Sequence, residues 1–246
     1  MTFIPLLAKV PNKRRAWTPA SLSNVRVWTD FSDASYITKD GFNNVTAILD
    51  KSGTGFSYSN ALTAGVWASG VQNGLGAVTF GGATRYTKVG AFTAAPTARC
   101  LLAVLKFTAI THANSLNAPG SGSDGYEYRG INSAGTAPGF DVLENGLVHH
   151  YIGGDISINV WHAISCQIVT AGSLGYPTGL GEGYIDGAIS GSSGTYNFTY
   201  TSAVTDQKLF DTLDAVVGEM IITDSLLDAG TRASWFSYAK AKWGTP

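Results

Sequence analysis

The sequence predicts an all-β fold, an antiparallel sandwich or jelly roll, that ends in one α-helix. Strand-like segments with period-two or continuous apolar character recur about every eight to fifteen residues, and turns rich in Gly, Asn and Ser separate them. They do not alternate with helical patterns, so a parallel sheet is not indicated. At the C-terminal end, intervals of three, four, seven and eight residues instead connect Trp235, Tyr238, Ala239, Lys242 and Trp243. That spacing predicts one face of an amphipathic helix.

The composition fits one multi-stranded domain. The chain has 246 residues, of which 44% are hydrophobic and 13% are charged, together with 30 glycines. The charged share is about half of the usual value. Aromatic and β-branched residues occur throughout, so the chain does not resemble a disordered one.

In the first half, residues 25–30 alternate with period two and predict a strand. Residues 50–55 carry turn chemistry (Asp-Lys-Ser-Gly-Thr-Gly). Residues 77–80 predict a strand that ends at a Gly-Gly turn, and residues 99–107 form the most apolar strand, suited to the middle of a sheet.

In the second half, the predicted strands cover residues 126–131, 139–143, 147–152, 161–169, 183–185 and 214–223. Asp186-Gly187 reads as a hairpin turn. For the final helix, Asp228 is suited to the N-cap, Gly244 to the position after the last turn, and Lys240 and Lys242 to the negative end of the helix dipole.

Charge divides the chain into two parts. Residues 1–16 contain four bases and no acid, whereas the remainder has a formal charge of −5. We therefore expect a basic N-terminal arm (residues 1–16) followed by one sandwich domain (residues 17–246). The arm either keeps the chain soluble or docks on an acidic partner surface through Lys9, Lys13, Arg14 and Arg15. Nucleic-acid binding is disfavoured because the body is acidic and no nucleic-acid motif accompanies the arm.

The sequence indicates synthesis in a reducing cytoplasm. Its first apolar residues precede the positive charges, the reverse of a secretory signal. No apolar run is long enough to span a membrane. Cys100 and Cys166 lie in apparent core strands, so we expect two buried free thiols.

Several motifs in order resemble a known family. They are Trp17-Thr18-Pro19, Trp28-Thr29-Asp30-Phe31-Ser32-Asp33, Asp50-Lys51-Ser52-Gly53, Trp161-His162, Tyr184-Ile185-Asp186-Gly187 and the segment from Gly218-Glu219 through Lys242-Trp243-Gly244. Together they resemble the laminin-G-like, concanavalin-A-like jelly rolls of bacteriophage virion proteins. The resemblance covers residues 17–244, although residues 108–158 carry little of it.

The resemblance implies a concanavalin-A-like jelly roll in a virion protein. On this basis Trp28, Trp161 and Trp243 are expected to be buried, while Asp30 and Asp50 bond backbone amides at turns. Glu219, between a glycine and an apolar strand, is expected to be a satisfied structural carboxylate rather than a reactive one.

Catalytic patterns are not found. A glycosidase needs two carboxyl groups about 5–9.5 Å apart. On one strand, Glu182 and Asp186 would lie about 13 Å apart. Glu219 and Asp224 would face opposite sides of a strand, and Asp211 and Asp214 fall in an expected loop. A catalytic pair formed by acids from two different strands stays an open alternative. Gly191-Ser192-Ser193-Gly194 lacks the strand–turn–helix context of a nucleophile elbow.

Cofactor patterns are equally absent from the sequence. His149 and His150 would point to opposite faces of a strand and could not share a metal. The Gly-rich stretch 120–125 lacks the features of a phosphate-binding loop. We therefore expect no cofactor, with calcium left open through Asp124 and Glu127.

Glycan binding is a separate expectation. Lectin-like sites place aromatic faces beside planar polar groups on loops. Residues of this kind are Tyr126, Tyr128, Arg129 and Tyr176. The alternative is that Tyr126 and Tyr128 are ordinary strand aromatics.

Two functions follow as hypotheses, and neither is enzymatic. The first is a structural component of a phage virion, either a capsid decoration protein or a tail or fibre module. It would be anchored by its arm to major capsid or tail proteins, and a homo-oligomer such as a trimer would suit either place. The second is an adhesin that binds host surface glycans, on the same virion or elsewhere. A glycoside hydrolase is a weaker third.

Overall fold

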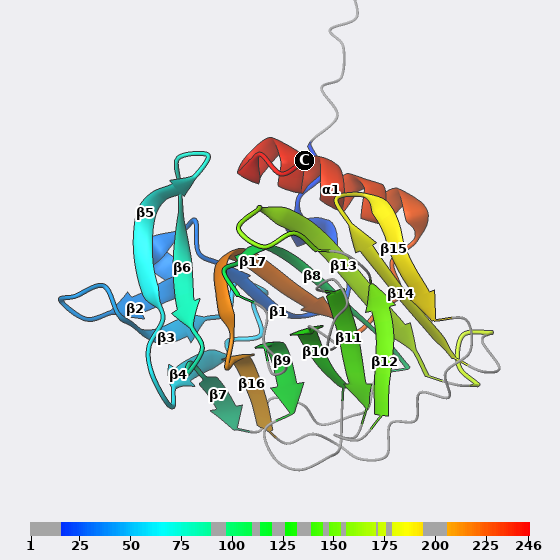
Figure 1. Ribbon diagram of the computed structural model, residues 1–246, viewed down its shortest axis with the longest axis horizontal. Coiled ribbons are helices and arrows are strands. Elements are labelled where there is room, and N and C mark those ends of the chain that lie inside the picture. The colour runs from blue at the N-terminus through cyan, green and yellow to red at the C-terminus, as the bar shows by residue number, and fades with distance from the viewer. Residues whose placement is uncertain are drawn as a thin grey trace, which may run out of the picture.

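The structure, a computed structural model, shows two antiparallel sheets and one terminal helix (Figure 1). It describes residues 16–89, 97–109, 114–119, 126–131, 139–144, 148–153, 156–170, 172–175, 179–193 and 206–246. All strand pairs in both sheets are antiparallel, as the sequence predicts. The basic residues of the arm lie outside the described residues, so the expected arm and its boundary stay predictions.

The first sheet has eight strands, in the order β15-β14-β13-β8-β17-β6-β5, with β1 also paired to β17. The bounds are β1 Val25–Asp30, β5 Val66–Gln72, β6 Leu75–Gly81, β8 Ala98–Phe107, β13 His162–Val169, β14 Leu180–Ile185, β15 Ala188–Ser193 and β17 Asp214–Thr223. Strand β17 pairs with β6 before Gly218 and with β1 after it. Two motifs of the family resemblance, at Trp28–Asp30 and at Gly218-Glu219, therefore lie on paired strands.

The second sheet has nine strands, in the order β12-β11-β10-β9-β16-β7-β4-β3-β2. The bounds are β2 Ile37–Lys39, β3 Val45–Leu49, β4 Ser57–Asn60, β7 Tyr86–Val89, β9 Asn114–Pro119, β10 Tyr126–Ile131, β11 Gly139–Glu144, β12 Val148–Gly153 and β16 Asp206–Asp211. Short 3-10 turns occupy Pro19–Ser21 and Ala34–Tyr36. The sequence does not predict β2, β3, β4, β7, β9 or β16, because strands of three to six residues give only a short periodic signal.

The central strands of the first sheet, β13, β8 and β17, are buried on both faces. Side chains such as Leu101, Ala103 and Leu105 of β8 face the second sheet, whereas Leu102 and Val104 face the helix. A strand covered on both sides reads as a continuous apolar run rather than an alternating one. This explains the apolar segment at 99–107 and confirms its predicted central position.

Helix α1 (Ala229–Trp243) covers the outer face of the first sheet (Figure 1). The side chain of Asp228 accepts the amide of Thr231 at 2.7 Å, and Gly244 ends the helix with φ +67°. Trp235, Ala239 and Trp243 are buried against the sheet. Both predicted caps and the predicted buried face are confirmed.

Candidate functional site

A buried polar cluster joins α1 to the centre of the first sheet. Glu219 on β17 has no exposed surface. Its Oε1 accepts the indole N–H of Trp28 at 2.8 Å, and its Oε2 accepts the indole N–H of Trp243 at 3.0 Å. The hydroxyl of Tyr238 lies 3.1 Å from each oxygen. Glu219 is thus the satisfied structural carboxylate that the sequence predicts.

Lys242 connects this carboxylate to Asp30. Its amine donates to Glu219 Oε2 and to both oxygens of Asp30, each at 2.9 Å. Lys51 also donates to Asp30 at 2.9 Å. The sequence places Lys242 on the amphipathic face and near the negative end of the helix dipole, and it predicts that Asp30 bonds a backbone amide at a turn. Asp30 Oδ1 does accept the backbone N–H of Ser32, at 3.2 Å. The two lysines are further partners of Asp30 that the sequence does not predict.

The pKa values of the two acids in this cluster are shifted in opposite directions. Burial opposes ionisation of Asp30, but Lys242, Ser32 and Lys51 outweigh it and hold the pKa of Asp30 below its usual value. Burial, together with the neighbouring charge of Asp30, raises the pKa of Glu219. All of these partners belong to the chain itself, so the cluster holds the helix on the sheet.

Asp50 supports the same region as predicted. Its Oδ1 accepts the backbone N–H of Trp28 at 2.6 Å, and its Oδ2 accepts the hydroxyl of Thr54 at 2.6 Å. The turn after β3 is therefore bonded to strand β1.

His162 and Asp186 form a second polar pair. Asp186 Oδ2 lies 2.6 Å from His162 Nδ1, and Asp186 Oδ1 accepts the amide of Ala163 at 2.8 Å. Asp186 has φ +50° and belongs to the β14–β15 turn, so the strand geometry assumed for Glu182 and Asp186 is wrong. His162 Nε2 is buried and has no hydrogen-bond partner among the residues that the structure describes.

An open depression lies between the β14–β15 hairpin and α1. Its lining residues are Tyr184, Gly187, Ala229, Arg232, Ala233 and Phe236, and its volume is about 360 Å³. We call it the Tyr184 depression. Tyr184 and Phe236 are partly exposed aromatics, and the two alanines are small residues of the helix.

The side chains of the Tyr184 depression are held in place. The guanidinium of Arg232 lies over the ring of Tyr184 at 4.5 Å and donates to the carbonyl of Leu227 at 2.6 Å. A Cβ on Gly187 would lie 3.8 Å from Phe236, so the ring packs closely on the turn. Gly187 has φ +89°, a conformation that glycine adopts without strain.

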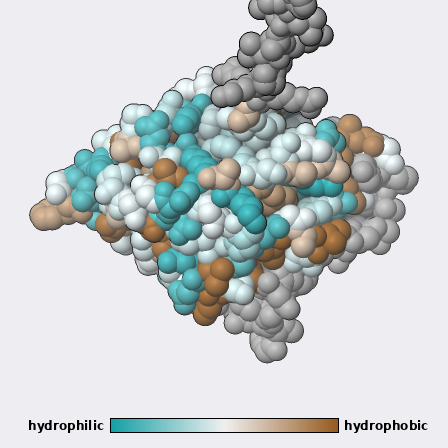
Figure 2. Space-filling view, turned by 90° about the horizontal axis from the view of Figure 1, so that it is seen from above, coloured by the Kyte–Doolittle hydropathy of each residue, from teal (hydrophilic) through white to brown (hydrophobic). Residues whose placement is uncertain are grey.

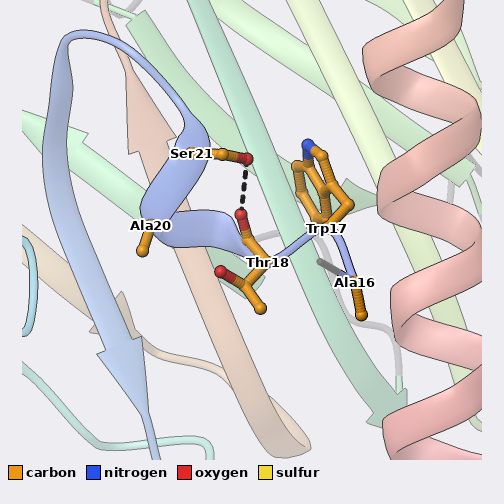
Figure 3. A pocket seen from close by; sticks show the side chains of 5 residues that line it. All are labelled: Ala16, Trp17, Thr18, Ala20 and Ser21. Atoms are coloured by element: carbon orange, nitrogen blue, oxygen red, sulfur yellow. Dashed lines mark hydrogen bonds between the residues drawn. The ribbon is translucent and has the colours of Figure 1, made fainter. Parts of the chain in front are cut away.

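A further depression follows the start of the described chain. Ala16, Trp17, Thr18, Ala20 and Ser21 line it, and the Trp17 ring lies on the side facing α1 (Figure 3). The hydroxyl of Ser21 donates to the carbonyl of Thr18 at 2.7 Å. Trp17 also makes an edge contact with Tyr238, with ring centroids 5.8 Å apart. Its ring therefore helps to cover the polar cluster.

Of the predicted glycan-binding residues, only Tyr128 has a described side chain. Tyr128 is 1% exposed and lies in the core between the sheets, where its hydroxyl donates to the carbonyl of Arg99 at 3.3 Å. Its ring has no exposed face for a ligand, because β10 turns it toward the first sheet. Tyr126 and Arg129 lie on the same strand, but only their backbone is described, and Tyr176 lies outside the described residues.

Other sequence predictions have clear positions. Cys100 and Cys166 are buried free thiols, as expected. Asp211 and Asp214 end β16 and begin β17 rather than occupying a loop, because only two residues connect these strands. For calcium, Asp124 and the side chain of Glu127 are outside the description. The described side chains include no group of three or more His, Cys, Asp or Glu suited to a metal ion.

No helix in the described part of the chain has the length and apolar character needed to cross a membrane.

Comparison with known proteins rests on structure alone. No family model and no curated protein matches the sequence. Among solved structures, domain 4 of AbnA, a GH43 extracellular arabinanase from Geobacillus stearothermophilus, matches with a TM-score of 0.59 and 13% identity. The match covers 86% of this chain and 98% of that domain, which was solved in complex with arabinotriose.

Botulinum neurotoxin binding domains match over part of their length. The serotype G domain gives a TM-score of 0.59 at 14% identity, covering 91% of this chain and 54% of that one. The D/C domain in complex with SialylT gives 0.56 at 10%, covering 88% and 52%. This chain thus spans about half the length of these domains. It has their β-sandwich fold.

The Tyr184 depression was missed by sequence reasoning. Tyr184 was quoted only as part of a hairpin motif, and Phe236 was not singled out at all. A usable signal exists, since Arg232 and Phe236 are four residues apart and so lie on one helix face. That face differs from the one that Trp235, Ala239 and Trp243 bury.

Proposed function

We propose that this chain is a non-catalytic carbohydrate-binding module that uses the Tyr184 depression. The observation that carries the proposal is the pairing of two partly exposed rings, Tyr184 and Phe236, with the fixed guanidinium of Arg232 in one open depression. Sugar rings present apolar C–H faces and many hydroxyl groups. Aromatic faces beside planar polar groups suit both.

The dimensions agree with this role. Ligand pockets occupy about 300–1,000 Å³, so a depression of about 360 Å³ suits a short saccharide. Ala229 and Ala233, which also line it, are small residues. The side that carries α1 shows separate hydrophobic patches between hydrophilic areas rather than one continuous apolar face (Figure 2).

The structural neighbours support the same class of ligand. The domain of AbnA was solved with arabinotriose, and one neurotoxin binding domain with SialylT. Since sugar-bound proteins share this sandwich, it is a suitable scaffold for a glycan site. The support concerns the fold and not individual residues, because these proteins are only 10–13% identical to this chain.

Two observations support a role without catalysis. Asp30 and Glu219 are bonded to each other through Lys242 beneath the helix, and Asp186 is bonded to His162. Glu182 accepts Gln167 Nε2 at 2.7 Å and the Tyr184 hydroxyl at 3.2 Å. A glycosidase instead needs two carboxyl groups that flank an accessible bond.

The test is a glycan array probed with the full chain. We expect binding to at least one polysaccharide or host glycan, reduced by Tyr184→Ala and by Phe236→Ala. Phe42→Ala is the matched control, because Phe42 is 84% exposed in the projecting β2–β3 turn, away from α1 (Figure 1). Binding by no glycan would end the proposal. If Tyr126→Ala or Tyr176→Ala abolished glycan binding while Tyr184→Ala bound normally, the site would instead be the one predicted from the sequence.

We also propose that the module is carried on a bacteriophage particle, with residues 1–16 as its attachment arm. Four of the residues that give the family resemblance, Trp28, Asp30, Glu219 and Trp243, are joined in one cluster that includes Lys242. The partners would be capsid or tail proteins, and a trimer would suit either place. Deleting residues 1–16 should abolish incorporation while the body stays folded. Unchanged incorporation would remove the arm from this proposal.

A further inference from the structure

We propose that the Tyr184 depression selects neutral sugars and rejects acidic ones such as uronic and sialic acids. The inference rests on the proposed glycan-binding function and adds the chemical class of the ligand. It depends on which donors and charges the depression offers.

The single cation in the lining is already engaged. Arg232 Nη1 donates to the carbonyl of Leu227 at 2.6 Å, and Nη2 donates to the hydroxyl of Tyr184 at 3.1 Å. A carboxylate is best recognised by two parallel N–H groups of one guanidinium. Because both terminal nitrogens are held by internal acceptors, Arg232 is poorly placed to receive a carboxylate in this way. Its remaining N–H groups can still donate to single hydroxyl oxygens.

The surroundings are acidic. Glu182 Oε2 lies 3.9 Å from Arg232 Nη1 and accepts the Tyr184 hydroxyl. Asp228 directly precedes the lining residue Ala229, and Asp186 directly precedes Gly187. Lys240, four residues beyond Phe236, is the next cation along the helix. Glu182 therefore offsets the charge of Arg232, and an incoming carboxylate would approach two further acids.

A neutral sugar meets no such penalty. Its apolar face can lie against Phe236 or Tyr184, and its hydroxyls can donate to the carboxylate of Glu182. Like charges repel each other at short range near a protein surface. We therefore expect acidic sugars to bind at least about tenfold more weakly, which corresponds to about 1.4 kcal/mol.

The experiment measures binding of the full chain to two sets of polysaccharides at low ionic strength. The neutral set is arabinan, galactan, dextran and mannan, and the acidic set is polygalacturonate, alginate, hyaluronan and polysialic acid. We expect the tightest neutral ligand to exceed every acidic one by about tenfold or more. Equal or tighter binding of an acidic polymer would overturn this inference while leaving the glycan-binding function intact. Binding to neither set would overturn both.

Two variants locate the cause. Glu182→Gln removes the negative charge that lies 3.9 Å from Arg232 Nη1, and it should reduce the difference in affinity between the neutral and the acidic polysaccharides. Asp33→Asn is the control, because it removes one negative charge far from the depression. Asp33 follows β1 closely in the sequence, and β17, β8 and β13 separate β1 from β14 in the sheet. Asp33→Asn should leave the difference unchanged. An equal effect of both variants would show that net charge, rather than this site, sets the preference, and would contradict the inference.

Discussion

The amine of Lys242 donates to Glu219 Oε2 at 2.9 Å, at a point where Glu219 has no exposed surface. The same amine lies 2.9 Å from both oxygens of Asp30. One side chain near the end of the protein therefore ties α1 to β17 and β1. This bond fixes the helix that forms one wall of the Tyr184 depression.

Replacing Lys242 should weaken the fold. Lys242→Met would leave Asp30 and Glu219 buried with less compensating charge, and breaking a buried charge pair costs about 3–5 kcal/mol. Lys240→Met is the control, because Lys240 is exposed on the same helix and should change stability by less than about 0.5 kcal/mol. The measurement is the free energy of unfolding in urea. Equal losses in both variants would contradict the role given to Lys242.

Gly218 allows Trp243 to pack on β17. A Cβ at this position would lie 2.6 Å from two atoms of the Trp243 ring, and overpacking of this kind costs about 1–3 kcal/mol. Gly218→Ala should therefore lower the free energy of unfolding by this amount. Gly81→Ala, also in a strand, has nothing within 4 Å of the added Cβ and serves as control. A Gly218→Ala variant as stable as its control would show that Trp243 can move aside.

The low pKa of Asp30 predicts a pH dependence. Its folded pKa lies below the ordinary value of 3.8, so its contribution to stability is complete above that value. The contribution is lost as the pH falls through the folded pKa. Glu219 acts in the opposite sense. Because its pKa is raised in the folded state, Glu219 stays protonated to a higher pH there than in the unfolded chain. Its contribution to the free energy of unfolding therefore falls as the pH rises above 4.5.

Comparison of Asp30→Asn with the wild type isolates the first effect. Unfolding free energies measured between pH 2.5 and 7 should fall less steeply below pH 4 in the variant, although the variant is less stable at pH 7. Identical slopes would show that Asp30 has an ordinary pKa in the folded protein.

The two thiols should be inert in the native state. Burial raises the pKa of Cys100 to about 12 and also raises that of Cys166. A thiol reagent needs the thiolate and access to it. We expect no reaction with Ellman's reagent before unfolding and reaction of both thiols in urea. Rapid reaction in buffer would mean that the sheets open locally.

Local patterns were enough for the longer elements and for the two ends of the helix. Asp228 and Gly244 are recognisable as caps, and Asp186-Gly187 as a hairpin turn, because each depends on neighbouring residues. The burial of Glu219 was expected from its position between a glycine and an apolar strand. These features arise within a few residues of sequence.

Contacts between distant segments could not be predicted in the same way. Lys242 and Asp30 are separated by 212 positions, so helical periodicity gives the face of Lys242 but not its partner. Likewise, strand alternation groups residues by face without showing which face meets the core, and Tyr128 lies on the core face. The Tyr184 depression is lined by residues of the β14–β15 hairpin and of α1. These two segments are distant in the sequence and become neighbours only when the chain folds.

The most direct test of a glycan site at the Tyr184 depression is titration calorimetry with the oligosaccharide form of the best array ligand. An aromatic contact contributes about 0.5–1.5 kcal/mol beyond its buried area. We therefore predict that Tyr184→Ala binds about tenfold more weakly than the wild type, while Phe42→Ala binds equally well. Binding of Tyr184→Ala with wild-type affinity would contradict the assignment of this depression as the site.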